Sequence, residues 1–217
     1  MVQILPTLFA KTEEDYKRQV EQIESSGTFK DGWVQIDLMD NKFVPNLSIG
    51  LDMLAKYSIS SKKEAQLMIA EPGSWIDQLA KLKFMRIIFP IEVGKTGQLI
   101  EQVKGYQIQV GLSINPETEV DKLLEFLDRI DLVLVMGVHP GFQGQKLIPE
   151  TLDKIIELAK LKSKYSFLIG EDGGINLQTV KSLVRAGVDN LAVGSFLFKG
   201  DINENLEKLW EAIRDGD

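Results

Sequence analysis

Eight short β-like runs, each followed by apolar residues at helical spacing, recur along this chain at intervals of roughly 25 residues. Strands that alternate with helices form parallel βαβ units, because a parallel neighbour is reached only through a crossover connection. An open doubly wound sheet and a closed barrel both satisfy this pattern. The count of eight units within 217 residues favours the barrel. The sequence therefore predicts an α/β protein with one domain, residues 1–217, folded as a closed (β/α)8 (TIM) barrel.

Local signals place the predicted elements along the chain. The β-like runs cover residues 2–7, 33–40, 64–70, 84–93, 107–114, 131–138, 166–171 and 190–198. Thr12 is predicted to cap the first helix and Gly27 to end it, while Asn176 is predicted to cap the helix that Gly187 ends. After the fifth run, an apolar pattern predicts a further helix through four positions: Val120, Leu123, Leu124 and Leu127.

The second run carries polar side chains where a buried strand normally has aliphatic ones. Its alternation places Gln35, Asp37 and Met39 on one face and aliphatic residues on the other. A buried polar pair is costly unless it binds or reacts with something. The alternative interpretation is an amphipathic edge strand whose polar face is exposed to solvent. The seventh run favours the functional one, because it also ends in an aspartate, Asp172, followed by two glycines.

Composition removes several classes of protein. The chain has no cysteine and a single histidine, His139, which excludes zinc sites built on sulfur, thiolate nucleophiles and metal sites with two imidazoles. The net charge of −7 and the pI of about 4.9 argue against nucleic acid or an anionic membrane as a partner. No apolar run reaches membrane-spanning length, and the N-terminus lacks a basic leader, so we expect a cytoplasmic protein.

Glycines near the ends of the last runs predict a phosphate site. Barrels of this kind commonly bind phosphate at the loops after strands seven and eight, where backbone N–H groups can approach without a Cβ in the way. Tight turns alone are the alternative reason for glycine here. The predicted substrate-binding positions in these loops and in the sixth are Gly141, Gly144, Gly173, Gly174, Gly194 and Ser195.

Asp37 and Asp172 are predicted to approach the barrel mouth from opposite sides. One carboxylate can then remove a proton from a carbon next to a carbonyl, and the other can return a proton to the opposite face. The enediolate formed in between needs an electrophile, either a metal or preorganised donors. Met39 and Met136 fall at strand ends, where they either line the sugar-phosphate site or fill gaps in the core.

Several motifs, in the right order along the chain, resemble those of the ribulose-phosphate 3-epimerase family. They are Asp37-Leu38-Met39-Asp40, Phe43-Val44-Pro45-Asn46, Asn115-Pro116, Val135-Met136, Pro140-Gly141-Phe142, Gly144-Gln145, Asp172-Gly173-Gly174-Ile175-Asn176 and Gly194-Ser195. The resemblance implies a ribulose-phosphate-binding barrel, an isomerase that inverts C3 of ribulose 5-phosphate to give xylulose 5-phosphate, and a homo-oligomer. It also implies that Asp37 and Asp172 are the acid/base pair.

The chain departs from the family at the metal site. The resemblance implies a divalent metal held by Asp37, Asp172 and two histidines, but Gln35 and Gln66 stand in the histidine positions, and Thr7 replaces a usual serine. Three outcomes stay open. The site retains magnesium or manganese rather than zinc or iron, it works without metal through the amide N–H groups, or it has lost catalysis. His139 matches a variable position of the family, and we expect it at the surface or the rim of the site.

Three functions follow from these observations. The first is a 3-epimerase acting on a small-molecule ketopentose phosphate through an enediolate. The second is a non-catalytic paralogue that binds a sugar phosphate. The third is an aldolase-type cleavage on the same barrel, which nothing in the sequence favours, since no lysine at a strand end has a clear Schiff-base role.

Overall fold

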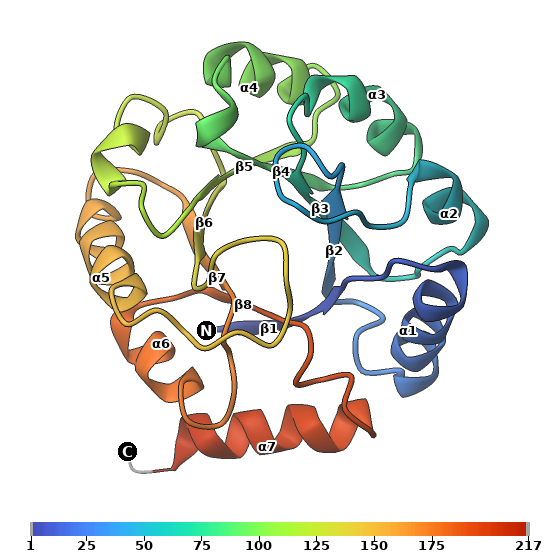
Figure 1. The fold of residues 1–217 in the computed structure, drawn as a ribbon. Coiled ribbons are helices and arrows are strands. Elements are labelled where there is room, and N and C mark those ends of the chain that lie inside the picture. Colours follow the sequence, from blue (N-terminus) through green and yellow to red (C-terminus); the bar gives the residue numbers. More distant parts are fainter. Residues whose placement is uncertain (1, 216–217) are drawn as a thin grey trace.

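The computed structural model describes residues 2–215, which form a closed barrel of eight parallel strands in sequence order (Figure 1). Pairing between the first and last strands closes the barrel, with Gln3 opposite Asn190 and Pro6 opposite Val193. The predicted (β/α)8 barrel is confirmed. The strands are β1 (Gln3–Leu8), β2 (Trp33–Met39), β3 (Lys62–Met68), β4 (Arg86–Pro90), β5 (Gln109–Ile114), β6 (Leu132–Met136), β7 (Leu168–Asp172) and β8 (Asn190–Val193).

Helices surround the barrel as an outer ring (Figure 1). The predicted caps of the first helix are confirmed: Thr12 accepts a hydrogen bond from the Asp15 N–H, and Gly27 ends the helix at φ 67°. No helix within residues 2–215 is long and apolar enough to cross a membrane. The α-helices are α1 (Glu13–Ser26), α2 (Leu51–Lys56), α3 (Gly73–Lys81), α4 (Thr96–Lys104), α5 (Thr151–Leu161), α6 (Val180–Ala186) and α7 (Ile202–Arg214); short 3-10 helices cover Ile91–Val93 and Val120–Leu123.

The predicted helix after β5 is wrong beyond its first turn. Only the 3-10 helix Val120–Leu123 forms, and the chain continues in turns closed by bonds to the third residue back, such as Phe126 N–H to Leu123 O. Leu123 and Leu127 are buried but Leu124 is 44% exposed. Val120 is buried as well, so the apolar spacing marked three buried positions rather than a regular α-helix.

The predicted cap of α6 is also misplaced. Asn176 starts a separate turn, in which its side chain accepts from the Gln178 N–H, and the helix begins one turn later at Val180. Gly187 ends it at φ 109°, as expected. Two strands, β4 and β8, are each about five residues shorter than predicted, because β4 stops at Pro90 and β8 stops before Gly194.

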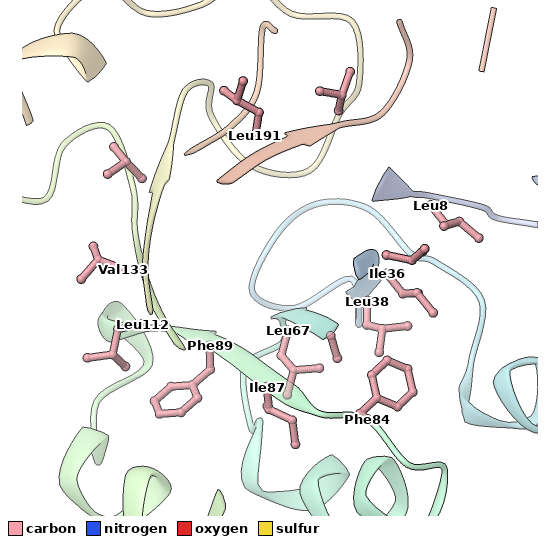
Figure 2. Close-up of a cluster of buried hydrophobic side chains, with 14 of the residues drawn as sticks. Leu8, Ile36, Leu38, Leu67, Phe84, Ile87, Phe89, Leu112, Val133 and Leu191 are labelled. Atoms are coloured by element: carbon pink, nitrogen blue, oxygen red, sulfur yellow. The ribbon is translucent and has the colours of Figure 1, made fainter. Parts of the chain in front are cut away.

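The strands bury aliphatic side chains on their outer face, where the helices cover them. Figure 2 shows part of this layer, with Leu38, Leu67 and Phe89 packed among their neighbours. A smaller apolar cluster lies apart from this layer: Ile88, Leu132, Leu134 and Met136. On β2 and β3, four polar residues alternate with the aliphatic ones: Gln35, Asp37, Glu64 and Gln66.

Candidate active site

Two neighbouring strands and one strand across the barrel bring the predicted polar residues together. In the parallel pairing of β2 and β3, Asp37 lies opposite Gln66 and Met39 opposite Met68. Asp172 is the last residue of β7 and pairs with Met136 of β6. Strand alternation and barrel closure together direct these side chains to a common point.

The side-chain nitrogen of Gln35 is the atom at which these groups meet. It donates to Asp37 Oδ1 at 3.0 Å and to Asp172 Oδ2 at 3.0 Å, and it lies 2.7 Å from Gln66 Oε1. Gln35 is fully buried, and its own Oε1 has no hydrogen-bond partner. The predicted convergence of Asp37 and Asp172 is therefore observed, with an amide N–H₂ group bridging the two carboxylates.

The amide of Gln66 meets the two aspartates favourably in only one of its two orientations. With its oxygen beside Gln35 and its nitrogen 3.0 Å from Met136 Sδ, that oxygen also faces the carboxylate oxygens of both aspartates, which are acceptors. In the other orientation, its nitrogen donates to Asp172 Oδ2 at 2.6 Å and to Asp37 Oδ1 at 3.0 Å.

Burial perturbs both carboxyl groups. Desolvation raises the pKa of Asp37 well above its usual value, the nearby Asp172 charge raises it further, and the Gln35 hydrogen bond opposes the shift. Desolvation likewise raises the pKa of Asp172 to about 7, against the Gln35 hydrogen bond. Because like charges this close resist joint ionisation, the two carboxyl groups lose their protons one after the other rather than together. One group is then ready to accept a proton and the other to donate one.

A buried ion pair lies beside the glutamines. Glu64, opposite Gln35 in the β2–β3 pairing, binds Arg86 through Oε2 at 2.6 Å, and both side chains are 2% exposed. Arg86 also donates to Gln109 Oε1 at 3.0 Å and lies over the Trp33 ring at 4.2 Å. The sequence analysis did not single out Glu64, although it shares a strand face with Gln66, and it did not identify Arg86.

Above the aspartates lies a cavity of about 240 Å³. Of the predicted site residues, Gln35 and Gln66 lie beneath it rather than on its wall. Within the described residues, Lys199 is the one basic side chain on the wall, and the sequence analysis missed it because it follows β8 by several residues. The predicted residues that line the cavity are Thr7, Asp37, Met39, Met136, Gly141, Gly144, Asp172, Gly173, Gly174, Gly194 and Ser195.

Hydrogen bonds explain the motif that follows β2. Asp40 accepts from the backbone N–H groups of Lys42 and Phe43 through Oδ1 and from that of Ala70 through Oδ2. Burial raises the pKa of Asp40, but these N–H groups outweigh burial and hold it below its usual value. Asn46 then donates to the Gly141 carbonyl. The loops after β2 and β6 are thereby tied together at the cavity wall.

Glu171 is a second buried acid that the sequence analysis did not single out. It precedes Asp172 on β7, is fully buried, and neither of its carboxyl oxygens has a hydrogen-bond partner. A Cβ on Gly137 would lie 2.0 Å from Glu171 Oε1, so the glutamate occupies the space that glycine leaves. Burial, followed by the Asp172 charge, raises the pKa of Glu171 well above its usual value.

His139 lies outside the cavity wall, with a side chain that is 62% exposed and Nδ1 3.0 Å from Glu117 Oε1. It takes no part in the cluster of aspartates and glutamines, so the one imidazole of the chain does not complete a metal site.

The donor set does not fit the divalent metal that the sequence resemblance implied. Within residues 2–215, no group of three or more His, Cys, Asp or Glu side chains is placed to hold a metal ion. At the point where the two aspartates converge, the chain presents an amide nitrogen, which donates protons and offers no lone pair to a cation.

Comparisons with known proteins agree with this architecture. A sequence profile described as the Ribulose-phosphate 3 epimerase family matches residues 3–198. The ribulose-phosphate 3-epimerase of Treponema pallidum (strain Nichols) is 34% identical over 212 residues, covering 94% of this chain and 95% of that protein. The protein of that name from Schizosaccharomyces pombe is 35% identical over 210 residues, covering 94% and 90%.

Solved structures with lower identity share the fold. The 3-hexulose-6-phosphate synthase of Salmonella typhimurium is 16% identical with a TM-score of 0.67, over 98% of each chain. A tryptophan synthase α-subunit from Pyrococcus furiosus is 12% identical with a TM-score of 0.70, over 97% of this chain and 96% of the other. These similarities show the barrel alone. The profile match and the close relatives go further: this chain belongs to the ribulose-phosphate 3-epimerase family, a family of isomerases.

Proposed function

We propose that this protein inverts C3 of a ketopentose phosphate, interconverting ribulose 5-phosphate and xylulose 5-phosphate, with Asp37 and Asp172 as the acid/base pair. Family membership supports the reaction class. The observation that carries the proposal is the bridge at Gln35, whose amide nitrogen lies 3.0 Å from each aspartate at the base of the cavity. Two acids held to one point from different strands are what a two-sided proton transfer requires.

The cavity supports a bound sugar phosphate in one orientation. Glycine-rich loops after β6, β7 and β8 form its wall together with Lys199, while the aspartates lie at its base. Backbone N–H groups and a lysine suit a phosphate dianion, so the phosphate lies at the glycines and C3 at the carboxyl groups. Met39 and Met136, also on the wall, suit the carbon chain between these ends.

The proton steps balance within the pair. The ionised aspartate removes the C3 proton, and the C–H electrons form the C2–C3 double bond as charge moves to the C2 oxygen. The protonated aspartate then delivers its proton to the opposite face of C3, and the C2 carbonyl forms again. The two aspartates have exchanged protonation states, which the reverse reaction or solvent restores.

Solvent deuterium exchange tests this function. Incubated with ribulose 5-phosphate in D2O, the protein should place deuterium at C3 and form xylulose 5-phosphate, both followed by proton NMR. Asp37→Asn and Asp172→Asn should each reduce the rate by about 10²-fold or more, since each removes one acid/base group. Asp77→Asn, on exposed α3, is the matched control and should leave the rate unchanged.

Binding without exchange would overturn the proposal. If calorimetry shows that the sugar phosphate binds while no deuterium enters C3, with or without added Mn²⁺, the protein is the non-catalytic binding paralogue. The buried acid pair favours the enzyme, because a binding site has no physical reason to keep two desolvated carboxyl groups facing each other.

Three further properties belong to this proposal. The chain is one domain over residues 1–217, which the span of its strands and helices from Gln3 to Arg214 supports. It forms a homo-oligomer in the cytoplasm, an expectation drawn from the family resemblance and the sequence. One relative, from Oryza sativa subsp. japonica and 36% identical over 174 residues, is named a cytoplasmic isoform. Light scattering during size-exclusion chromatography measures the oligomeric state directly.

A further inference from the structure

Four polar side-chain atoms form a tight cluster at the base of the cavity. The Gln35 nitrogen lies 3.0, 3.0 and 2.7 Å from Asp37 Oδ1, Asp172 Oδ2 and Gln66 Oε1. When the Gln66 amide is turned so that its nitrogen faces the aspartates, it donates to Asp172 Oδ2 at 2.6 Å and to Asp37 Oδ1 at 3.0 Å. Each atom thus contacts its neighbours at hydrogen-bond distance.

Gln35 faces the aspartates with the wrong atom for a metal ligand. A divalent cation needs lone pairs at about 2.0–2.2 Å, and a side-chain N–H₂ group has none to offer. If the amide were turned, its oxygen would lie beside two carboxylate oxygens and both hydrogen bonds would be lost. Its N–H₂ group would then occupy the position of Oε1, which has no hydrogen-bond partner.

The position of the amide is fixed by the barrel itself. Gln35 lies in the middle of β2, paired with Thr7 of β1 on one side and with Glu64 of β3 on the other. Its side chain is fully buried. From this fixed point it reaches Asp37 on its own strand and Asp172 on β7, two residues that are not on adjacent strands.

We propose that the Gln35 amide takes the place of a metal ion as the group that holds Asp37 and Asp172 together, so that the chain binds no divalent cation at this site. Gln35 is a positioning residue: it is buried beneath the cavity and acts through the two aspartates. Its role in turnover rests on the proposed epimerase function. The absence of metal binding does not, and it can be measured whether or not the protein is active.

Metal content provides the first test. The protein is incubated with Mn²⁺, Zn²⁺ or Mg²⁺, dialysed and measured by inductively coupled plasma mass spectrometry, and its melting temperature is compared with and without EDTA. We expect far less than one metal ion per chain and no shift with EDTA. A retained ion near one per chain, or a melting temperature that EDTA lowers, would overturn the proposal.

Restoring imidazoles gives a positive control for that measurement. Gln35→His/Gln66→His should retain about one Zn²⁺ per chain and melt higher with zinc, because two histidines and two carboxylates form an ordinary zinc site. Gln22→His/Gln102→His, at two glutamines outside the site, should retain none. The wild-type result is decisive even if the double variant folds poorly.

The positioning role provides the second test. Gln35→Met keeps the size of the side chain, removes the bridging N–H₂ group and also removes the unpaired Oε1. We expect kcat for the deuterium exchange to fall about 10²-fold with KM nearly unchanged and the melting temperature maintained. Gln19→Met is the matched control at another buried glutamine, whose amide donates to Phe9 O. It should lower the melting temperature but not kcat.

The two failures are distinguishable. If wild-type protein shows no exchange and no metal, the proposed function fails while the metal-free site stands. If wild-type protein exchanges deuterium and Gln35→Met has wild-type kcat, the positioning role of Gln35 is wrong.

Discussion

Two carboxyl groups that share one proton set the pH dependence expected at the scale of single residues. Desolvation raises the pKa of Asp172 to about 7 and that of Asp37 well above its usual value. In the active form one aspartate is ionised and the other is protonated. This form is populated as pH rises through about 7, and it is lost at higher pH when the second aspartate also ionises. The exchange rate, measured between about pH 5 and 9, should be bell-shaped with its acid limb near 7. A rate already maximal at pH 5, as for unperturbed carboxylates, would contradict this.

Glu171 makes a separate prediction about stability. Its folded pKa lies well above the usual 4.5, so the fold favours the protonated form. The resulting stabilisation is complete below about 4.5 and is lost as pH rises towards the folded pKa, at up to about 1.4 kcal/mol per pH unit. Glu171→Gln, which cannot ionise, should therefore gain stability relative to wild type as pH rises above that value. Urea unfolding of both proteins across this pH range measures the difference in their free energies of unfolding. A difference that does not change with pH would show that the pKa of Glu171 is not raised in the folded protein.

The sequence predicted the aspartates of the site but not the buried Glu171. Gln35, Asp37 and Met39 were assigned to one face by alternation, which is local and follows from strand geometry alone. Glu171 received no assignment, because its burial depends on Gly137, a residue of another strand's loop that leaves room for the carboxyl group. A partner across the barrel is not encoded in the neighbouring sequence.

The loops that form the cavity wall give a prediction at the scale of elements. Gly174 and Gly144 both have positive φ, 71° and 77°. A Cβ on Gly174 would lie 2.4 Å from the backbone nitrogen of Leu147, whereas nothing lies within 4 Å of one on Gly144. Gly144→Ala should lower the free energy of unfolding by about 1–2 kcal/mol through backbone strain alone. Gly174→Ala should lower it by about 1–3 kcal/mol more, because of the clash.

Denaturation and the KM for the sugar phosphate measure this contrast. Because the clash moves the β6 loop against the β7 loop, Gly174→Ala should also raise KM, while Gly144→Ala changes KM less. Equal losses of stability in the two variants would show that backbone conformation, not the contact between the loops, is the reason for glycine after β7.

Elements were predicted best where one local signal decided them. Thr12 and Gly27 defined α1 because capping involves residues within one turn. The helix predicted after β5 was wrong. The chain just before it is held by a residue distant in sequence, since Lys154 of α5 donates to the carbonyls of Asn115, Pro116 and Thr118. Apolar spacing could not distinguish three buried positions in a turn-rich segment from the apolar face of an α-helix.

At the scale of the whole molecule, closure of the barrel turns separate motifs into one site. β2 and β7 are not adjacent, and their aspartates meet only because β1 pairs with both β2 and β8. The same closure brings the loops after β6, β7 and β8 around one cavity. Figure 1 shows the closed ring of strands. An open sheet with the same strands would leave Asp37 and Asp172 apart.

By itself, the sequence determined the eight βα units, the polar face of β2 and the identity of the two aspartates, because each follows from spacing or residue type within a short stretch. Only the tertiary structure decided that the Gln35 nitrogen lies between those aspartates, that Arg86 neutralises Glu64 and that Glu171 is buried without a partner. The physical reason is that hydrogen bonding and desolvation depend on which atoms are neighbours in space, and barrel closure sets those neighbours.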